Sequence, residues 1–223
     1  MTIKVITIAE DILGANEERA QNNRNRLDEQ GTLAVNIMAS PGAGKTSLIL
    51  NTIDRLKNKV RMAVIEGDVA STIDAEKVNE KDVAVVQINT AGGCHLDANM
   101  IDNALNNLPL EDIDLLLIEN VGNLICPVEF ALGEHKRVLI SSLPEGDDKP
   151  HKYPVMFSDV DVVLLNKIDL QPYLDFDIDA FSKTVIGLNP EVKIFPVSCR
   201  TGEGLEAWFS WLGTLIKDRK DQK

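Results

Sequence analysis

Short runs of mostly apolar residues recur along the middle of the chain, and each has the length of a strand. They are rich in Val and Ile, which is typical of parallel strands covered by helices on both faces. Helix-like segments separate several of them, so the pattern predicts an α/β fold with a mostly parallel central sheet. The runs are LAVNIM (33–38), RMAVIE (61–66), VAVVQI (83–88), IDLLLIE (113–119), RVLISS (137–142), VDVVLLN (160–166) and VKIFPV (192–197).

The two ends of the chain carry helical patterns instead. Residues 1–30 contain a predicted amphipathic helix that packs on the domain or leads into it. A second helix is predicted over 205–217, and residues 218–223 form a charged tail that we expect to fray. The intervening domain therefore covers residues 31–217. The apolar positions of the two helices are Ile12, Ala15, Ala20 and Leu27, and Leu205, Trp208, Leu212 and Leu215.

Length and composition fit one large domain with an aliphatic core. The chain has 223 residues, of which 44% are hydrophobic and 4% are aromatic, and its formal net charge is -12. Such an acidic chain argues against a nucleic-acid partner, which requires a basic face. Three cysteines do not suggest a disulfide framework, and no apolar run reaches the ~18 residues of a membrane span. Without a signal peptide, we expect a cytoplasmic protein with no membrane partner.

Ligands of parallel α/β sheets bind beyond the carboxyl ends of the strands, and a phosphate-binding motif follows the first run. Ala39-Ser40-Pro41-Gly42-Ala43-Gly44-Lys45-Thr46-Ser47 matches G-x-x-x-x-G-K-[ST], except that Ala39 replaces the first glycine. Gly42, Ala43, Gly44 and Ser47 would turn backbone N–H groups toward the phosphates. Lys45 would reach the β- and γ-phosphates, and the Thr46 hydroxyl would bind Mg²⁺. The fold prediction becomes a three-layer P-loop NTPase.

A strand that ends in Asn166-Lys167-Ile168-Asp169 indicates guanine rather than adenine. The carboxylate of Asp169 can accept hydrogen bonds from guanine N1–H and the exocyclic amine, which adenine does not offer there. The stem of Lys167 would cover the base, and Asn166 would tie neighbouring loops together. Ser198 and Cys199 follow the last strand, where a backbone N–H could meet the guanine carbonyl.

Two further strands end in acidic residues that are candidates for Mg²⁺, bound directly or through water. Asp68 follows the run 61–66, and Glu119 closes the run 113–119. Gly122 lies where a GTPase senses the γ-phosphate through a backbone N–H. With Lys45 and Thr46, we therefore assign Glu119 and Gly122 to the predicted catalytic group of a slow GTPase.

A second chemistry is suggested by Cys94-His95, in a glycine-bearing loop, and Cys126, four residues beyond Gly122. Thiolate and imidazole suit Zn²⁺ and Ni²⁺, but three ligands are too few for a closed tetrahedral site. A homodimer could complete it, or the site could be labile. The alternative is that these cysteines are structural. We expect His135 and His151 at the surface.

In order, the segments SPGAGKTS, EGD, TAGGCH, ENVGNLICP and NKID resemble the hydrogenase nickel-incorporation GTPase family, commonly called HypB. The resemblance runs from about residue 12 to 212. It implies GTP-dependent dimerisation and delivery of nickel to the [NiFe]-hydrogenase large-subunit precursor, together with a small zinc-containing nickel chaperone. It also assigns the metal site of the family's GTPase domain to Cys94, His95 and Cys126, and nucleotide and Mg²⁺ positions to Gly42–Ser47, Asp68, Glu119, Asn166 and Asp169.

Other readings stay open on the residues alone. The urease-accessory nickel GTPase looks similar, but typically has Cys-Pro-His where this chain has Cys94-His95. A regulatory GTPase switch would use the same nucleotide motifs with merely structural cysteines. The segment 166–169 opposes an ATP-dependent kinase. The chain also has neither the amino-terminal Cys cluster nor the His-rich stretch of some family members, so we do not expect bulk nickel storage.

Overall fold

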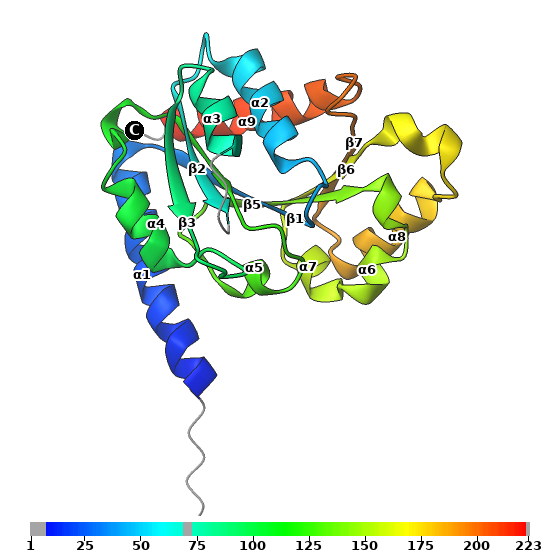
Figure 1. Cartoon of the computed structure of the whole chain (residues 1–223), viewed down its shortest axis with the longest axis horizontal. Helices are drawn as coiled ribbons and strands as arrows, with labels where there is room; N and C mark the ends of the chain where they lie inside the picture. The colour runs from blue at the N-terminus through cyan, green and yellow to red at the C-terminus, as the bar shows by residue number, and fades with distance from the viewer. Residues whose placement is uncertain (1–7, 69–72, 222–223) are drawn as a thin grey trace, which may run out of the picture.

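The computed structural model describes residues 8–68 and 73–221, without the side chains of residues 8–12 and Ile73. One sheet dominates the described part, and all its strands are parallel, in the order β3-β2-β4-β1-β5-β6-β7 (Figure 1). Each of the seven apolar runs forms a strand, which confirms the predicted α/β fold. The strands are β1 Leu33–Ala39, β2 Met62–Asp68, β3 Ala84–Asn89, β4 Leu115–Glu119, β5 Lys136–Ser142, β6 Val162–Asn166 and β7 Lys193–Pro196.

Helices cover both faces of this sheet, giving three layers (Figure 1). On one face lie α2 (Lys45–Leu56), α3 (Ile73–Asn79) and α9 (Leu205–Lys220). On the other face, α1 (Ile8–Gln30) and α4 (Ala98–Leu105) pack against β2, β4 and β1. The remaining helices on that side are α5 (Cys126–Glu129), α6 (Lys149–Lys152), α7 (Pro154–Ser158) and α8 (Ile178–Leu188), with short 3-10 turns η1 (Leu110–Asp112), η2 (Leu143–Glu145) and η3 (Ile168–Tyr173).

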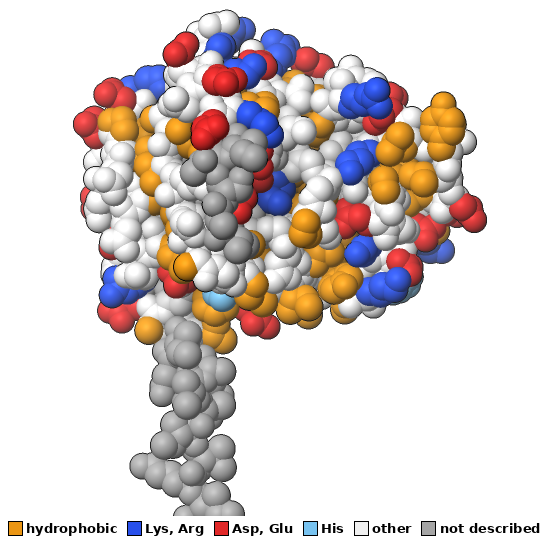
Figure 2. All heavy atoms as spheres, in the orientation of Figure 1, with side chains coloured by type: hydrophobic (Ala, Val, Ile, Leu, Met, Phe, Trp, Pro, Cys, Tyr) orange, Lys and Arg blue, Asp and Glu red, His pale blue; other side chains and the backbone are white. Residues whose placement is uncertain are grey.

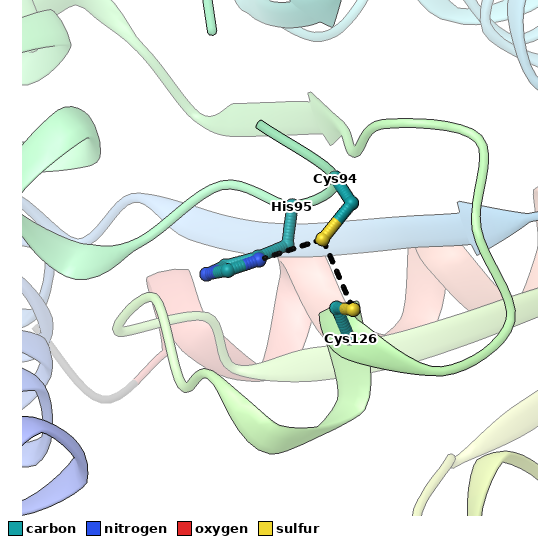
Figure 3. A group of neighbouring side chains, drawn as sticks. All are labelled: Cys94, His95 and Cys126. Carbon is teal, nitrogen blue, oxygen red and sulfur yellow. Dashed lines mark hydrogen bonds between the residues drawn. The ribbon is translucent and has the colours of Figure 1, made fainter. Parts of the chain in front are cut away.

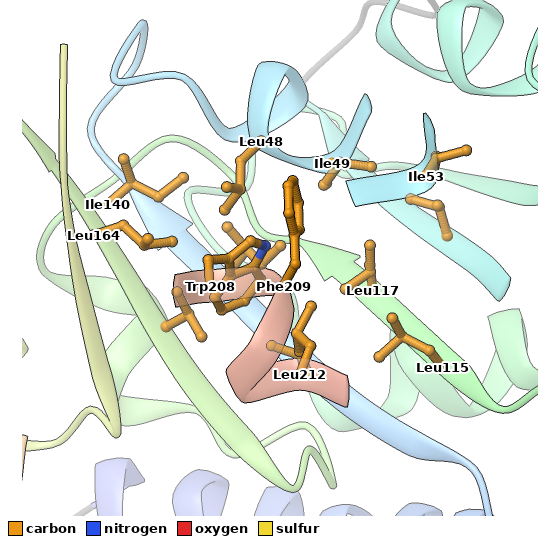
Figure 4. Close-up of a cluster of buried hydrophobic side chains, with 14 of the residues drawn as sticks. Leu48, Ile49, Ile53, Leu115, Leu117, Ile140, Leu164, Trp208, Phe209 and Leu212 are labelled. Atoms are coloured by element: carbon orange, nitrogen blue, oxygen red, sulfur yellow. The ribbon is translucent and has the colours of Figure 1, made fainter. Parts of the chain in front are cut away.

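Alternating side chains of each strand enter the two cores, as period-two geometry requires. In β1, Val35 and Ile37 face α2 and α9, whereas Met38 faces the opposite side. Trp208 of α9 is fully buried at the centre of the first core (Figure 4). Its indole N–H donates to Thr52 Oγ1 at 2.9 Å, so the one polar atom of the ring is satisfied. This core holds α2, and therefore the P-loop before it, against the sheet.

Helix α1 is held by amides as much as by apolar contacts. Its buried positions are Asn16, Ala20, Asn23 and Leu27. Asn23 Nδ2 donates to the carbonyls of Ala98 and Leu132, at 2.8 and 3.0 Å. Ala15, which the apolar pattern placed on the packed face, is exposed, and the side chain of Ile12 lies outside the described residues. The inward face therefore keeps the predicted Ala20 and Leu27, but Asn16 takes the place predicted for Ala15, and the face is partly polar.

At the other end, α9 continues to Lys220 rather than ending at 217. Arg219 donates to the carbonyl of Thr32 at 3.0 Å and forms an ion pair with Asp28. Lys220 pairs with Asp114 at 3.1 Å. The predicted fraying tail is therefore wrong for 218–220, because basic side chains of the last turn find acidic partners. Residues 222–223 lie outside the described part.

The predicted surface position of His135 is also wrong, because its side chain is 9% exposed. Nδ1 accepts the N–H of Ala34 at 2.9 Å, and Nε2 lies 2.9 Å from Asp28 Oδ1. The acceptor role of Nδ1 leaves the proton on Nε2. Burial lowers the pKa of His135 to about 4. Within the described part of the chain, every helix is too short or too polar to cross a lipid bilayer.

Candidate functional site

The P-loop joins β1 to α2 through two glycines in left-handed backbone. Gly42 has φ 75° and Gly44 has φ 114°, conformations that favour glycine. A Cβ on Gly44 would also lie 2.4 Å from Asn166 Nδ2. Ala39, the departure from the motif, is the last residue of β1 and is fully buried in the core. Its φ is not positive, so alanine fits where the motif has its first glycine.

A cavity of ≈ 460 Å³ lies above this loop and brings most of the predicted phosphate and Mg²⁺ residues together. Thr46 Oγ1 donates to Glu119 Oε1 at 3.1 Å, and Lys45 Nζ lies 3.8 Å from the same oxygen. The other oxygen, Glu119 Oε2, is buried without a hydrogen-bond partner. A carboxylate with a vacant lone pair beside a threonine hydroxyl fits a divalent cation. The cavity is lined by Gly42, Gly44, Lys45, Thr46, Ser47, Asp68, Glu119 and Gly122, together with Pro41, Gly67, Asp74, Lys77 and Val121.

Glu66 lies beside Glu119, because β2 and β4 pair these two residues in register. It is 3% exposed. Burial and the neighbouring Glu119 carboxylate raise the pKa of Glu66 to about 10. Burial also raises the pKa of Glu119, while Lys45 opposes that shift. The raised pKa favours the protonated form of Glu66 beside the Glu119 carboxylate at neutral pH.

A second cavity, of ≈ 430 Å³, continues from the P-loop toward β6 and β7. Asn166 connects its walls: Nδ2 donates to the carbonyl of Ala43 at 2.8 Å, and Oδ1 accepts the N–H of Cys199 at 3.0 Å. Lys167 lies in left-handed backbone at φ 64°, and its ammonium donates to the carbonyl of Gly42 at 2.8 Å. The Asp169 carboxylate lines this cavity too. The cavity has the walls that a purine base needs.

The loop after β7 carries Ser198 and Cys199, which the sequence places at the guanine carbonyl. The N–H of Ser198 donates to the carbonyl of Glu203 at 2.9 Å, and the N–H of Cys199 is taken by Asn166. The assignment of a backbone N–H here to the guanine carbonyl stays a prediction, since these are the partners of the two groups in the structure without nucleotide. Ser198 Oγ donates to Asp169 Oδ1 at 2.6 Å and orients the carboxylate. Burial raises the pKa of the Cys199 thiol to about 11, and this side chain lines the cavity.

Cys94, His95 and Cys126 form a cluster on the same edge of the sheet, beyond β3 and β4 (Figure 3). Cys94 Sγ lies 3.0 Å from Cys126 Sγ and 3.5 Å from His95 Nδ1, and all three ligand atoms are within 4.8 Å of one another. Tetrahedral Zn–S bonds of ~2.3 Å need sulfurs ~3.8 Å apart, so the pair needs to open by under ~1 Å. The donor set suits a borderline metal such as Zn²⁺ or Ni²⁺.

The cluster is accessible and shaped by aromatic packing. Cys94 is exposed, and the His95 ring stacks on Phe130 with centroids 3.9 Å apart and planes at 24°. Burial lowers the pKa of His95, which favours the neutral, metal-binding imidazole. Ile125, next to Cys126, is 59% exposed. Figure 2 shows hydrophobic side chains gathered at the lower edge of this face, over α5 and α7.

Sequence reasoning missed several residues of this site. Glu66 could have been found, since it lies two residues before Asp68 on one strand and so shares its face. Asp74 and Lys77 of α3 line the phosphate cavity and pair with each other at 2.7 Å. They are ordinary charged residues of a helix, and no motif marks them. Phe130 carries no signal either, because its contact with His95 depends on the fold.

The fold and this edge of the sheet define a P-loop NTPase that also carries a thiol–imidazole cluster. Residues 33–196 match the CobW/HypB/UreG nucleotide-binding domain. A hydrogenase maturation factor HypB from Rhizobium leguminosarum bv. viciae is 46% identical over 209 residues, which cover 94% of this chain and 70% of that protein. The chain therefore belongs to the CobW/HypB/UreG family and, within it, to the HypB group.

Solved structures agree with this placement. HypB from Archaeoglobus fulgidus superposes with a TM-score of 0.86 at 42% identity, covering 91% of this chain and 99% of that one. HypB from Helicobacter pylori in complex with nickel gives 0.87 at 36% identity, covering 92% and 96%. The resemblance suggested by the sequence motifs is thus confirmed over nearly the whole chain.

Proposed function

We propose that this chain is a GTP-hydrolysing metallochaperone that couples GTP binding, dimerisation and hydrolysis to nickel insertion during [NiFe]-hydrogenase maturation. The observation that carries the proposal is the position of Cys126. It lies on the segment that leaves the phosphate cavity at Gly122, and it meets Cys94 and His95 there. A group that responds to the terminal phosphate and a set of metal ligands therefore share one short segment.

Guanine selection rests on Asp169. The carboxylate accepts the guanine N1–H and amine, while Ser198 holds one of its oxygens in place. Adenine leaves this carboxylate without donors, which is costly for a charged acceptor. Asn166 and Lys167 keep the base cavity joined to the P-loop.

Hydrolysis uses the other cavity. Thr46, Asp68 and Glu119 would hold Mg²⁺, which neutralises charge on the phosphates when bound. Lys45 binds the β- and γ-phosphates from the start of α2, where the helix dipole also favours anions. Glu66, whose pKa is raised, would add no second negative charge beside Glu119 at neutral pH. Gly122 lies against the P-loop, since a Cβ there would be 3.1 Å from Pro41.

Nickel is the cargo in this proposal, and zinc is the alternative occupant. The nickel complex of the Helicobacter pylori relative supports the choice of nickel. Three ligands leave a tetrahedral site open, so a second copy of the chain would complete it. The exposed Ile125 beside Cys126 gives that contact an apolar rim. Open coordination would let metal pass on once hydrolysis loosens the pair of subunits.

The proposed partners are those that the resemblance to the family implies. We propose a cytoplasmic protein that receives nickel from a small zinc-containing nickel chaperone and delivers it to the hydrogenase large-subunit precursor. The relatives from Rhizobium leguminosarum and Escherichia coli are named hydrogenase maturation factors, which supports this assignment, and the Helicobacter pylori relative is named a hydrogenase/urease maturation factor. A regulatory GTPase with structural cysteines has less support, because Cys94 and Cys126 are accessible and lie close to an imidazole.

Gel filtration with metal analysis tests the proposal. The wild-type protein is run with Mg²⁺ and Ni²⁺ in the presence of GDP or of a non-hydrolysable GTP analogue. We expect a dimer that retains nickel with the analogue, and a monomer with less nickel with GDP. Cys94→Ala should lose the nickel and keep the nucleotide. Identical profiles with both nucleotides would contradict the coupling, and unchanged nickel in Cys94→Ala would support the regulatory switch.

A further inference from the structure

The loop that carries Cys94 and His95 is attached to the nucleotide site by two asparagine side chains. Both belong to the segment 119–126, which begins at Glu119 and ends at Cys126. Asn120 is fully buried, and its Oδ1 accepts the N–H of Leu96 at 3.1 Å. Asn123 Nδ2 donates to the carbonyl of Cys94 at 3.2 Å. The metal-binding loop is thus held on both sides of His95.

These two asparagines flank the residues that face the terminal phosphate. The Oδ1 of Asn120 also accepts the N–H of Val121 at 2.9 Å, so one oxygen bridges Val121 and Leu96. The Oδ1 of Asn123 accepts the N–H of Ile125 at 2.9 Å. Val121 and Gly122 line the phosphate cavity between them. A shift of Val121 and Gly122 would therefore move the side-chain amides of both Asn120 and Asn123.

The far side of Asn120 is fixed to the sheet. Its backbone N–H donates to the carbonyl of Ile37 in β1 at 3.0 Å, and its Nδ2 donates to Asn36 Oδ1 at 3.2 Å. Asn36 is itself fully buried and donates to Glu134 at 3.2 Å. A buried amide with all these partners cannot rotate without leaving one unsatisfied. The side chain of Asn120 therefore ties the backbone of Leu96 and Val121 to Asn36 of β1.

Leu96 extends the connection to the other acidic strand. Its side chain is fully buried and packs on Gly67, where a Cβ would lie 2.7 Å from Leu96 Cδ1. Gly67 stands between Glu66 and the predicted Mg²⁺ residue Asp68. The metal-binding loop thus contacts both strand ends that would respond to Mg²⁺ and the γ-phosphate.

We propose that Asn120 and Asn123 are the positioning residues that transmit the state of the nucleotide to the Cys94–His95–Cys126 cluster. The inference rests on the proposed function and specifies how its two sites communicate. With GTP bound, the segment 119–126 is drawn to the phosphate, and the two amides fix the Cys94–His95 loop in the geometry that binds metal. With GDP, the segment relaxes, and the loop relaxes with it.

The test measures how strongly nucleotide changes metal affinity. Ni²⁺ alone is titrated into the protein with Mg²⁺ and either GDP or a non-hydrolysable GTP analogue, and thiolate–nickel absorbance reports binding. We expect the wild type to bind nickel about 5- to 150-fold more tightly with the analogue, the usual range of coupling between sites. Asn120→Ala and Asn123→Asp should bring this ratio close to ~1 while both nucleotides still bind.

The variants separate coupling from stability. Asn123→Asp keeps the acceptor for Ile125 and removes the donor to Cys94, on a partly exposed residue, and it also adds a charge beside the thiol of Cys126. The added charge changes nickel affinity with both nucleotides alike, so the ratio between the two nucleotides is the readout, and Asn123→Asp serves if Asn120→Ala does not fold. Asn189→Ala is the matched control, because it removes an amide whose hydrogen bonds to Val160 and Glu191, at 2.8 and 3.2 Å, lie outside both the segment 119–126 and the loop of Cys94 and His95. It should keep the wild-type ratio.

The outcomes distinguish this inference from the proposed function. A wild-type ratio of ~1 would overturn both, since no coupling would exist to transmit. A wild-type ratio well above ~1 that persists in folded Asn123→Asp and Asn120→Ala would overturn the role of the asparagines and leave the metallochaperone proposal standing. An equal loss in Asn189→Ala would show a general effect of destabilisation and would also overturn it.

Discussion

Two sites lie beyond the carboxyl ends of the strands, one at each end of this edge of the sheet, and they differ in how firmly their side chains are held. At the base-binding end, beyond β6 and β7, Asn166 and Ser198 are buried and hydrogen-bonded to neighbouring loops. At the metal-binding end, beyond β3 and β4, Cys94 is exposed and its thiol meets only another thiol and an imidazole. The groups of the base cavity are already held in place without a ligand, whereas the thiols of the metal cluster need to move apart to bind a metal.

This difference has a physical reason. Recognition of a base requires fixed donors and acceptors, because a displaced carboxylate loses its discrimination between purines. Transfer of a metal requires ligands that can gather and separate, and loops held by a few hydrogen bonds can do so at low cost. The P-loop after β1 lies between the two ends. In the proposed function, a nucleotide anchored at the rigid end acts on the movable one.

The largest effect is expected at the rigid end. Asp169→Asn exchanges an acceptor for a donor where guanine presents N–H groups, and two charged hydrogen bonds are worth about 3–6 kcal/mol. GTP affinity should therefore fall about 100-fold or more, whereas xanthosine triphosphate, with a carbonyl in place of the amine, should bind better than to the wild type. Titration with both nucleotides measures the change. Unaltered GTP affinity would remove Asp169 from the base site.

At the movable end, loss of one ligand should leave the nucleotide untouched. Cys126→Ser is expected to weaken nickel or zinc binding by at least about 10-fold, since even groups supporting a ligand contribute that much. Cys199→Ser is the matched control, because that thiol lies at the base cavity. Metal titration of both variants checks the comparison. A similar loss in Cys199→Ser would place the metal elsewhere.

Between the two ends, the Glu66–Glu119 pair should make the free energy of unfolding fall as pH rises above neutral. Glu66 keeps its proton in the folded protein up to a pKa of about 10, whereas the unfolded chain releases it near 4.5. Unfolding therefore releases a proton, and stability falls as pH rises through this window, by up to about 1.4 kcal/mol per unit. Glu66→Gln should flatten the slope between pH 7 and 9, measured by urea unfolding without metal or nucleotide. An unchanged slope would mean that Glu66 is ionised when folded.

A smaller effect of opposite sign is expected from His135, far from both ends. Its folded pKa of about 4 lies below the ordinary 6.5, so only the unfolded chain takes up a proton between these values. Stability should fall as pH drops from 6.5 toward 4, by at most about 1.4 kcal/mol per unit. His135→Gln should reduce this slope relative to the wild type in urea unfolding at pH 7, 6 and 5. A steeper slope in the variant would contradict a buried neutral imidazole.

The two ends also differ in how well the sequence predicts them. Apolar runs and the P-loop motif located each strand and the phosphate cavity, because strand burial and backbone curvature leave a local signature. The 166–169 motif predicted a base site, and the structure has a cavity lined by Asn166, Lys167 and Asp169. The partners of Ser198 and Cys199 were not predictable, since their N–H groups are taken by residues that only the fold brings near. Asn120 and Phe130 act across loops and leave no periodic pattern.

The ends of the chain repeat that lesson. Basic residues at 219 and 220 read as a solvated tail, but they meet Asp28 and Asp114 from distant segments. On α1, Ala20 and Leu27 are buried as their pattern predicts, but Asn16 and Asn23 are buried too, and the apolar Ala15 is exposed. In each case a charged or amide side chain finds its partner in a distant segment of the chain. Residue type alone predicts that such a side chain faces solvent.

The central claim, that the terminal phosphate controls the metal ligands, is tested most directly by following release. The protein is loaded with Ni²⁺, Mg²⁺ and GTP, and one turnover is monitored by phosphate production and by transfer of nickel to a chromophoric chelator. We predict that nickel appears with the rate constant of phosphate production and stays bound with a non-hydrolysable analogue. Nickel release at the same rate with GTP and with the analogue would contradict the account.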